Sequence, residues 1–260
     1  MKLILLQSDI CWQTPTANCL RAEVLLAAAP QVDLIVLPEV FATGFSIEAG
    51  EAERAAQAGA EVLEWMRRMA ARHDAAVAGS VVVEEQGNYY NRFYFVRPDG
   101  SFAAYDKRHL FTFAGEDRQF SPGQERVVVE WRGWRMLLQV CYDLRFPVFA
   151  RNRDDYDLIL YVANWPTKRI GVWDTLLAAR AIENACYVAG VNRTGSDPFV
   201  TYNGHSAWVD FKGNPLAQAE GEREEMLFCE ADKEALEAFR KRFPVLDDGD
   251  DFTLNLVKDI

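Results

Sequence analysis

The stretch that decides the fold runs from Met136 to Pro147 and reads MLLQVCYDLRFP. An apolar, strand-like run ends at Val140, Cys141 follows, and Pro147 suits the first turn of a helix. A strand–turn–helix connection places the turn residue beside unpaired backbone N–H groups. We therefore expect an exposed Cys141 thiol there, a favoured thiolate, and N–H groups able to bind an oxyanion. The alternative for a single free cysteine is a small buried core residue.

Similar apolar runs recur on both sides of this stretch and alternate with helix-like segments. The expected strands are Leu3–Leu6, Leu34–Leu37, Ala76–Val83, Phe93–Val96, Val127–Val129, Met136–Val140, Leu158–Val162 and Tyr187–Val191. The expected helices are Ala17–Ala29, Glu51–His73, Trp173–Asn184 and Glu234–Arg242. Several strands are apolar at every residue, which is typical of strands that are covered on both faces.

Two short turns predict antiparallel hairpins among these strands. One turn, Gly87-Asn88, lies between Ala76–Val83 and Phe93–Val96. The other, Arg132-Gly133, lies between Val127–Glu130 and Trp134–Leu138. Strands that alternate with helices and include some hairpins indicate a layered α/β protein with mixed sheets. The pattern alone leaves open whether there is one sheet or two.

Composition restricts the classes of protein. The chain has 260 residues, half of them hydrophobic, and shows no repeat or low-complexity tract, so we expect one domain over residues 1–260. A net charge of −11 argues against binding to nucleic acid or to an anionic membrane. No apolar run reaches the length of a signal peptide or a membrane helix, so we expect a soluble, cytoplasmic protein. Five scattered cysteines without metal-ligand spacing fit free thiols and predict no metal.

Two further segments carry groups that could assist a cysteine nucleophile. Glu39 follows the strand Leu34–Leu37 and Pro38, and a poorly solvated carboxylate suits general-base work. Its alternative is a helix-start acid or a loop salt bridge. Lys107 interrupts a strand-like stretch and could supply positive charge to an oxyanion; its alternative is a solvated basic turn. His109 and His205 have no distinctive context, so a Cys–His pair is not favoured.

Together these segments resemble the nitrilase, or carbon–nitrogen hydrolase, superfamily. The motifs occur in the order Glu, Lys, Cys and read Leu37-Pro38-Glu39, Tyr105–Phe111 and Val140–Pro147. The likeness continues through Asp157–Pro166, Ala179–Asn184 and Val191–Arg193, so it covers nearly the whole chain. The resemblance implies a four-layer αββα sandwich, an assembly of two or more subunits, and chemistry without a metal or an organic cofactor.

Within the superfamily the chain is similar to bacterial omega-amidases, through segments such as Glu39–Phe45, Trp131–Arg135 and Val162–Pro166. This likeness implies hydrolysis of the terminal amide of a small carboxylate-bearing substrate, such as 2-oxoglutaramate, with release of ammonia. The implied roles are nucleophile for Cys141, general base for Glu39, oxyanion binding for Lys107 and the Tyr142 N–H, and water positioning for Glu116. Other activities of the superfamily stay open: a nitrilase, an N-carbamoyl amidase, a deaminated-glutathione amidase, or a non-catalytic scaffold.

An anionic substrate requires a local cation, because the net charge of the protein repels it. Arg145 is the first candidate, since its planar fork suits carboxylates; its alternative is an ion pair with Asp143 or Glu183. Asn164 and Trp165 are expected at the substrate. Lys168 and Arg169 follow them, with an exposed basic turn as the alternative. The apolar stretch Arg145–Phe149 also predicts a homodimer or a larger homo-oligomer.

Overall fold

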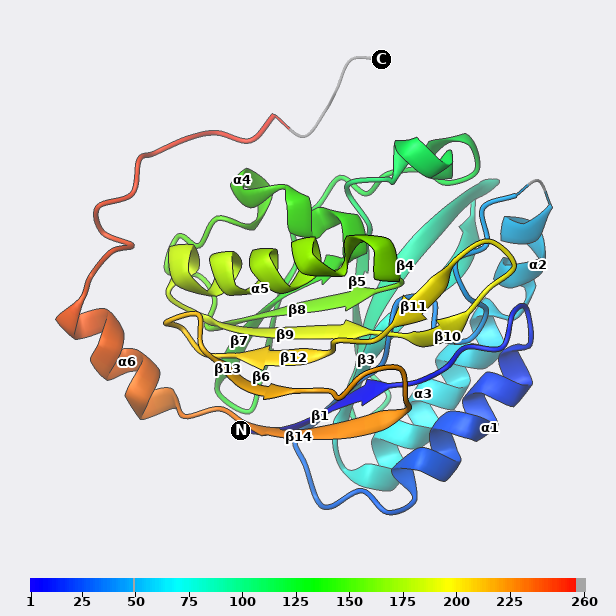
Figure 1. Cartoon of the computed structure of the whole chain (residues 1–260), viewed down its shortest axis with the longest axis horizontal. Coiled ribbons are helices and arrows are strands. Elements are labelled where there is room, and N and C mark those ends of the chain that lie inside the picture. Colours follow the sequence, from blue (N-terminus) through cyan, green and yellow to red (C-terminus); the bar gives the residue numbers. More distant parts are fainter. Residues whose placement is uncertain (49, 256–260) are drawn as a thin grey trace.

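The computed structural model describes residues 1–48 and 50–255, and within them two six-stranded sheets pack face to face (Figure 1). The first sheet has the order β14-β1-β2-β3-β4-β5 and the second has the order β13-β12-β9-β8-β7-β6. The strands of the first sheet are β1 (Lys2–Gln7), β2 (Leu34–Val36), β3 (Ala76–Glu85), β4 (Asn88–Val96), β5 (Phe102–Asp106) and β14 (Glu225–Glu230). Those of the second are β6 (Val128–Trp131), β7 (Trp134–Val140), β8 (Leu158–Ala163), β9 (Tyr187–Asn192), β12 (Ala207–Val209) and β13 (Pro215–Gln218).

Helices cover the outer face of each sheet. The helices are α1 (Pro15–Leu26), α2 (Glu51–Gln57) and α3 (Gly59–His73) beside the first sheet, α4 (Pro147–Ala150) and α5 (Ile170–Asn184) beside the second, and α6 (Lys233–Arg242) near the end of the chain. Short 3-10 turns and a small hairpin complete the fold: η1 (Thr112–Ala114), η2 (Glu116–Arg118), η3 (Cys141–Arg145), η4 (Thr167–Arg169), β10 (Thr194–Ser196) and β11 (Thr201–Asn203). The four-layer αββα sandwich is therefore confirmed.

Each sheet is built around three parallel strands, β1-β2-β3 in one and β7-β8-β9 in the other. Parallel strands end at the same edge of a sheet, and ligands commonly bind outside their carboxyl ends. The loops after β2, β7 and β8 carry the predicted residues Glu39, Cys141 and Asn164. The topology thus brings segments that are far apart in sequence to one edge.

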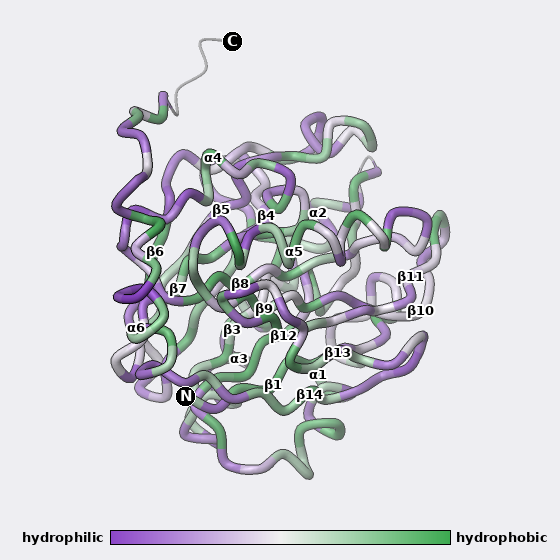
Figure 2. The backbone as a smooth tube through the Cα atoms, turned by 60° about the vertical axis from the view of Figure 1, so that its left-hand side comes forward, coloured by the Kyte–Doolittle hydropathy of each residue, from purple (hydrophilic) through white to green (hydrophobic). Residues whose placement is uncertain are grey.

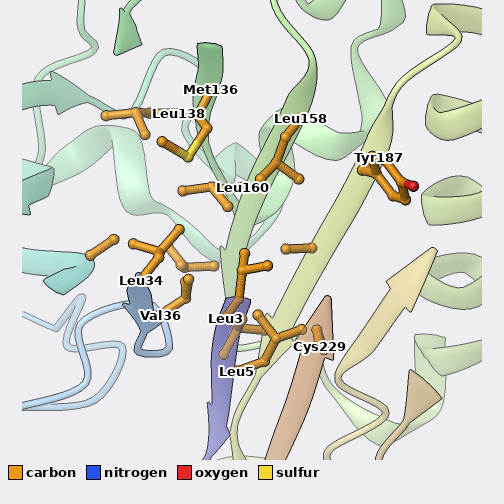
Figure 3. Packing of buried hydrophobic residues seen from close by; sticks show 14 of the residues in the cluster. Leu3, Leu5, Leu34, Val36, Met136, Leu138, Leu158, Leu160, Tyr187 and Cys229 are labelled. Carbon is orange, nitrogen blue, oxygen red and sulfur yellow. The ribbon is translucent and has the colours of Figure 1, made fainter. Parts of the chain in front are cut away.

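Alternating residues of the same strands fill three apolar layers. Leu3 and Leu34 of the first sheet meet Leu138 and Leu158 of the second in the central layer (Figure 3). Their immediate neighbours in sequence, such as Ile4, turn to the helices on the outside. Both faces of these strands are therefore buried, which explains why they are apolar at every position. Figure 2 shows the hydrophobic stretches in β1, β3 and β7, with hydrophilic stretches mostly in the connecting loops.

The expected helix Glu51–His73 is two helices, α2 and α3, which meet at Ala58. Gly59 begins α3 against the neighbouring strand, where an added Cβ would lie 2.8 Å from the backbone oxygen of Val82. Only glycine allows so close an approach, and the sequence periodicity carries no sign of it. The other three helices are found with ends shifted by up to three residues.

Both predicted hairpins are confirmed. The first turn is Gln86-Gly87, one residue earlier than expected, and Glu85 pairs with Asn88. Gln86 and Gly87 have φ of 53° and 78°, and Arg132 and Gly133 have φ of 46° and 78°, as a two-residue turn of type I′ requires. The sequence patterns did not predict the strands β10 to β14. These strands are at most six residues long, and all except β12 are partly exposed. No helix among the described residues is long and apolar enough to cross a lipid bilayer.

Candidate active site

Three loops bring Glu39, Lys107 and Cys141 together at the edge where the parallel strands end. Glu39 follows β2, Lys107 directly follows β5, and Cys141 directly follows β7. The Lys107 ammonium donates a hydrogen bond to Glu39 Oε1 at 3.0 Å, and both side chains are buried. The three predicted residues thus form one cluster in space, although they span more than a hundred positions of sequence.

Glu39 is fixed from several directions. Its Oε1 also accepts a hydrogen bond from Asn91 Nδ2 at 2.8 Å, and its Oε2 accepts one from the Asn164 N–H at 2.7 Å. The next residue, Val40, has φ of 40°, a left-handed conformation that is unusual for a β-branched residue. Ser80 holds this turn by accepting a hydrogen bond from the Val40 N–H at 2.8 Å. Such strain costs about 1–3 kcal/mol and persists only where the surrounding structure imposes it.

Glu116 completes a buried group of two carboxylates and one ammonium. Lys107 Nζ donates to Glu116 Oε1 at 3.0 Å and to Oε2 at 2.9 Å, and the Phe111 N–H donates to Oε2 at 2.6 Å. Burial alone would favour a neutral lysine, but Glu116 and Glu39 outweigh burial and hold the pKa of Lys107 above its ordinary value. The lysine therefore stays charged beside the thiol.

Cys141 lies in a strained turn with φ of 46°, at the first position of the 3-10 turn η3. The expectation that its thiolate is favoured is wrong. Burial, and then the negative charge of Glu39, raise the pKa of the Cys141 thiol well above its ordinary value, although Lys107 opposes them. The α-helix that follows is the single turn Pro147–Ala150, so little helix dipole is available. The resting cysteine is a thiol whose proton must be taken up during attack.

Asp143 joins the cysteine turn to the lysine segment. Its Oδ2 accepts hydrogen bonds from the Val140 N–H at 2.9 Å and the Tyr105 hydroxyl at 2.7 Å, and its Oδ1 accepts one from the His109 N–H at 2.9 Å. The His109 ring also lies 2.7 Å from Oδ1 through Nδ1. His109 therefore helps to hold the site in place. His205 lies elsewhere, with its Nδ1 3.1 Å from Asp174 Oδ2.

A cavity of about 220 Å³ opens beside Cys141. Glu39, Lys107, Cys141 and Tyr142 line it, and so do the predicted substrate-binding residues Arg145, Asn164, Trp165 and Arg169. Lys168 does not line this cavity; it faces a neighbouring hollow between η4 and the loop before β11. The Lys168 side chain is exposed, which agrees with the alternative of an exposed basic turn at this residue.

Arg145 forms neither of its alternative ion pairs among the described residues, and both carboxylates have other partners. Asp143 binds the groups described above, and Glu183 pairs with Arg180 at 2.9 Å. Arg145 instead lies over the ring of Trp165, with the guanidinium carbon 5.4 Å from the ring centroid. Its charge is thus presented to the cavity.

Sequence reasoning missed one partner of Glu39 and several residues that line the cavity. Asn91 lies in the middle of β4 and reaches Glu39 only because β3 and β4 pair. Four aromatic residues that line the cavity were also not predicted: Phe45 and Phe199 lie in loops, Phe113 in η1 and Tyr202 in β11. Within residues 1–48 and 50–255 no group of histidine, cysteine and acidic side chains is arranged to hold a metal ion.

The fold and this Glu–Lys–Cys group, with Glu39 and Lys107 buried and Cys141 half-buried, are those of a hydrolase of carbon–nitrogen bonds. The carbon-nitrogen hydrolase family matches the chain over residues 5–241. The chain is 50% identical over 255 residues to the omega-amidase YafV of Yersinia enterocolitica, with 98% of each chain covered. It is 36% identical to a 2-oxoglutaramate amidase of Bacillus subtilis, over 94% of this chain and 95% of that one.

A solved structure is similar over the whole fold. The crystal structure of a CN-hydrolase superfamily protein from Xanthomonas campestris, with an arsenic adduct in its active site, superposes with a TM-score of 0.93 at 43% identity. The superposition covers 98% of this chain and 99% of that chain. The chain belongs to the carbon–nitrogen hydrolase family, and it is an amidase of that family.

Proposed function

We propose that the chain hydrolyses the terminal amide of a small carboxylate-bearing compound, such as 2-oxoglutaramate, through a thioester on Cys141. The observation that carries this proposal is that Glu39, Lys107 and Cys141 line one cavity, with the buried Lys107 ammonium bound to Glu39. Relatives that cover nearly the full chain are an omega-amidase and a 2-oxoglutaramate amidase, which supports the choice of substrate class.

The first half-reaction begins with the Cys141 thiol. Glu39 takes the thiol proton as Sγ attacks the amide carbon, because a thiol with a raised pKa is a weak nucleophile until it loses that proton. The carbonyl oxygen becomes an oxyanion, which the Lys107 ammonium and the Tyr142 N–H stabilise. Tyr142 is the second residue of η3, and the first N–H groups of a helical turn have no partner within it. Glu39 then gives its proton to the leaving nitrogen, ammonia departs, and an acyl thioester remains.

The second half-reaction returns the enzyme to its starting state. Water enters at the position that ammonia has left, Glu39 takes one of its protons, and the hydroxide attacks the thioester carbon. Collapse of the second oxyanion breaks the carbon–sulfur bond, Glu39 returns the proton to sulfur, and the carboxylic acid leaves. Glu116 holds the Lys107 ammonium through both oxygens and thereby keeps it beside the reacting carbon in both steps.

The cavity volume supports a small substrate. Pockets for drug-sized ligands occupy roughly 300–1,000 Å³, whereas the cavity beside Cys141 measures about 220 Å³. A tripeptide-sized amide such as deaminated glutathione would extend beyond it. The intact Glu39, Lys107, Glu116 and Cys141 side chains disfavour a non-catalytic scaffold.

The experiment that tests the proposal is a substrate pulse followed by intact-protein mass spectrometry. Wild-type enzyme mixed with 2-oxoglutaramate and quenched with acid should carry the acyl group, and peptide mapping should place it on Cys141. Cys141→Ala should remain folded, show no adduct and release no ammonia, because no other group can form the thioester. Cys186→Ala removes a buried cysteine away from the cavity and serves as the control, with activity near wild type. Wild-type turnover in Cys141→Ala would contradict the proposal.

A further inference from the structure

Two arginines line the cavity, and both depend on Trp165. Arg145 lies over the Trp165 ring, with its guanidinium carbon 5.4 Å from the ring centroid. The indole Nε1–H of Trp165 donates a hydrogen bond to the backbone oxygen of Arg169 at 2.8 Å. Trp165 itself is buried and follows β8 by two residues, so it is anchored to the sheet. One indole therefore positions the side chain of one arginine and the backbone of the other.

The Arg169 side chain is positioned by the lysine segment. Its guanidinium carbon lies 5.1 Å from the ring centroid of Phe111, and the Phe111 N–H donates a hydrogen bond to Glu116. Contact with an aromatic face attracts the cation but uses none of its five N–H donors. A guanidinium that is already held on a ring also loses less conformational entropy when it binds an anion. Arg145 and Arg169 are thus pre-positioned cations with donors to spare.

The other acids of the cavity do not neutralise these arginines. Among the described residues, no carboxylate lies within ion-pair distance of either guanidinium. Asp197, which lines the same cavity, accepts hydrogen bonds from the Phe199 and Val200 N–H groups at 2.8 Å each. Glu48 is exposed, so solvent screens its charge. Two unpaired cations therefore face a cavity whose walls are largely aromatic.

We infer that Arg145 and Arg169 together form a carboxylate-binding site, positioned by Trp165, that selects amides carrying an acid group a few bonds from the scissile bond. The inference rests on the proposed amidase function and assigns its specificity to named residues. A planar guanidinium binds both oxygens of a carboxylate, and two guanidinium groups at one cavity can hold the acid group from two sides. When an amide without an acid group binds, these guanidinium donors have no partner. Such a mismatch lets a site discriminate strongly against the wrong substrate.

Steady-state kinetics on an acid and its ester test this site. We expect wild-type kcat/KM for 2-oxoglutaramate to exceed that for its methyl ester by at least about 100-fold, the value of a few charge-assisted hydrogen bonds. Arg169→Met and Arg145→Met should each lower kcat/KM for the acid by roughly 10–100-fold and change that for the ester by less than about threefold. Lys168→Met removes the neighbouring cation outside the cavity and should leave the ratio unchanged. Equal rates for acid and ester in the wild type, or equal losses for both in the arginine variants, would overturn the inference.

A binding measurement separates this inference from the proposed chemistry. Calorimetry with Cys141→Ala and the product dicarboxylate 2-oxoglutarate requires no catalysis. We expect Arg169→Met in that background to weaken the Kd by roughly 10–100-fold, and Lys168→Met to leave it unchanged. An unchanged Kd in Arg169→Met refutes the carboxylate site. Failure of wild-type enzyme to hydrolyse any amide, with the Kd effect intact, refutes the amidase proposal instead.

Trp165→Phe tests the positioning role. Phenylalanine keeps an aromatic face for Arg145 but loses the Nε1–H that holds the Arg169 backbone. We expect KM for the acid to rise by about tenfold with kcat within about threefold of wild type, because the lost tether affects binding and not the thiol chemistry. A fall in kcat with unchanged KM, for acid and ester alike, would show that Trp165 acts only on the fold of the loop.

Discussion

At the scale of single residues, the charges around Cys141 determine when its thiol ionises. Burial raises the pKa of the Cys141 thiol most, Glu39 raises it further, and Lys107 lowers it. Glu39→Gln should therefore lower that pKa, even though it removes the base and abolishes turnover. The pH titration of thiolate ultraviolet absorbance, taken as the difference from Cys141→Ala, measures this midpoint. We expect the midpoint to move to lower pH in Glu39→Gln, and a shift to higher pH would contradict the assigned electrostatics.

Lys107→Met should have the opposite effect on the thiol and also a large effect on turnover. Removing the ammonium raises the pKa of Cys141 further and deletes one partner of the oxyanion. Loss of a single oxyanion donor in other enzymes costs roughly 100–1,000-fold in kcat, and we expect at least that loss here, with KM changed by much less. Circular dichroism checks the fold, because Glu39 and Glu116 would face each other without the intervening cation. A folded Lys107→Met enzyme with an intact kcat would show that another group stabilises the oxyanion.

Residue types and their order along the chain predicted Glu39, Lys107 and Cys141, because each follows an apolar strand or lies in a distinctive charged segment. Glu116 was expected only through the resemblance to the superfamily. The ionisation state of Cys141 was beyond the same reasoning. It depends on how deeply the thiol is buried and on charges that only the fold brings near it. Asn91 was not predicted for a related reason. Its contact with Glu39 results from strand pairing, which leaves no pattern in the local sequence.

At the scale of elements, Asp143 holds two segments of the proposed active site together. Each of its oxygens accepts hydrogen bonds from two different groups. In Asp143→Asn one oxygen becomes an amide nitrogen, so at least one backbone N–H or hydroxyl loses its acceptor, at a cost of about 1–3 kcal/mol. We expect kcat to fall by at least about tenfold with little change in KM, because the turn carrying Cys141 loses its link to Lys107. Asp106→Asn, which alters an ion pair with Arg92 next to Lys107, is the matched control and should retain kcat.

Asp157 joins α6 to the second sheet and predicts an acid-dependent stability. Although burial opposes it, hydrogen bonds from Arg135 and Lys233 lower the pKa of Asp157 to about 2. A depressed pKa stabilises the fold above the unfolded-state pKa of about 4, and the contribution is lost as pH falls towards 2. Asp157→Asn should therefore cost about 2.5 kcal/mol in urea unfolding at pH 7, and about half of that at pH 3. Asp154→Asn, which alters an exposed carboxylate that also pairs with Arg135, should cost less than about 1 kcal/mol. An Asp157→Asn cost that does not change with pH would refute the ion-pair explanation.

The elements that were predicted correctly are those whose burial in the fold leaves a regular apolar or turn pattern in the sequence. Strands buried on both faces gave continuous apolar runs, and the type I′ turns at Gly87 and Gly133 marked the hairpins. The break between α2 and α3 at Ala58 was missed, because it reflects the close approach of Gly59 to Val82, a tertiary contact. The edge strands β13 and β14 bury few residues, so they lack the pattern that identifies a core strand.

At the scale of the whole molecule, the outer layer beside the second sheet exposes apolar side chains. Val148 on α4 and Ile182 on α5 are 57% and 55% exposed, whereas Phe149 of the predicted interface stretch is buried. Large contiguous apolar patches on the surface usually mark subunit interfaces. We therefore retain the prediction of a homodimer or a larger homo-oligomer and place its contact on α4 and α5.

Light scattering at micromolar concentration tests this assembly. Wild-type protein should have at least twice the mass of one chain, and Val148→Asp combined with Ile182→Asp should give monomers, since two desolvated carboxylates at a contact cost more than the apolar area they replace. Leu20→Asp combined with Val24→Asp is the matched control, because these residues of α1 are 61% and 67% exposed on the layer beside the first sheet. The control should keep the wild-type mass. A wild-type monomer would refute the prediction outright, and monomers from the control alone would move the interface to α1.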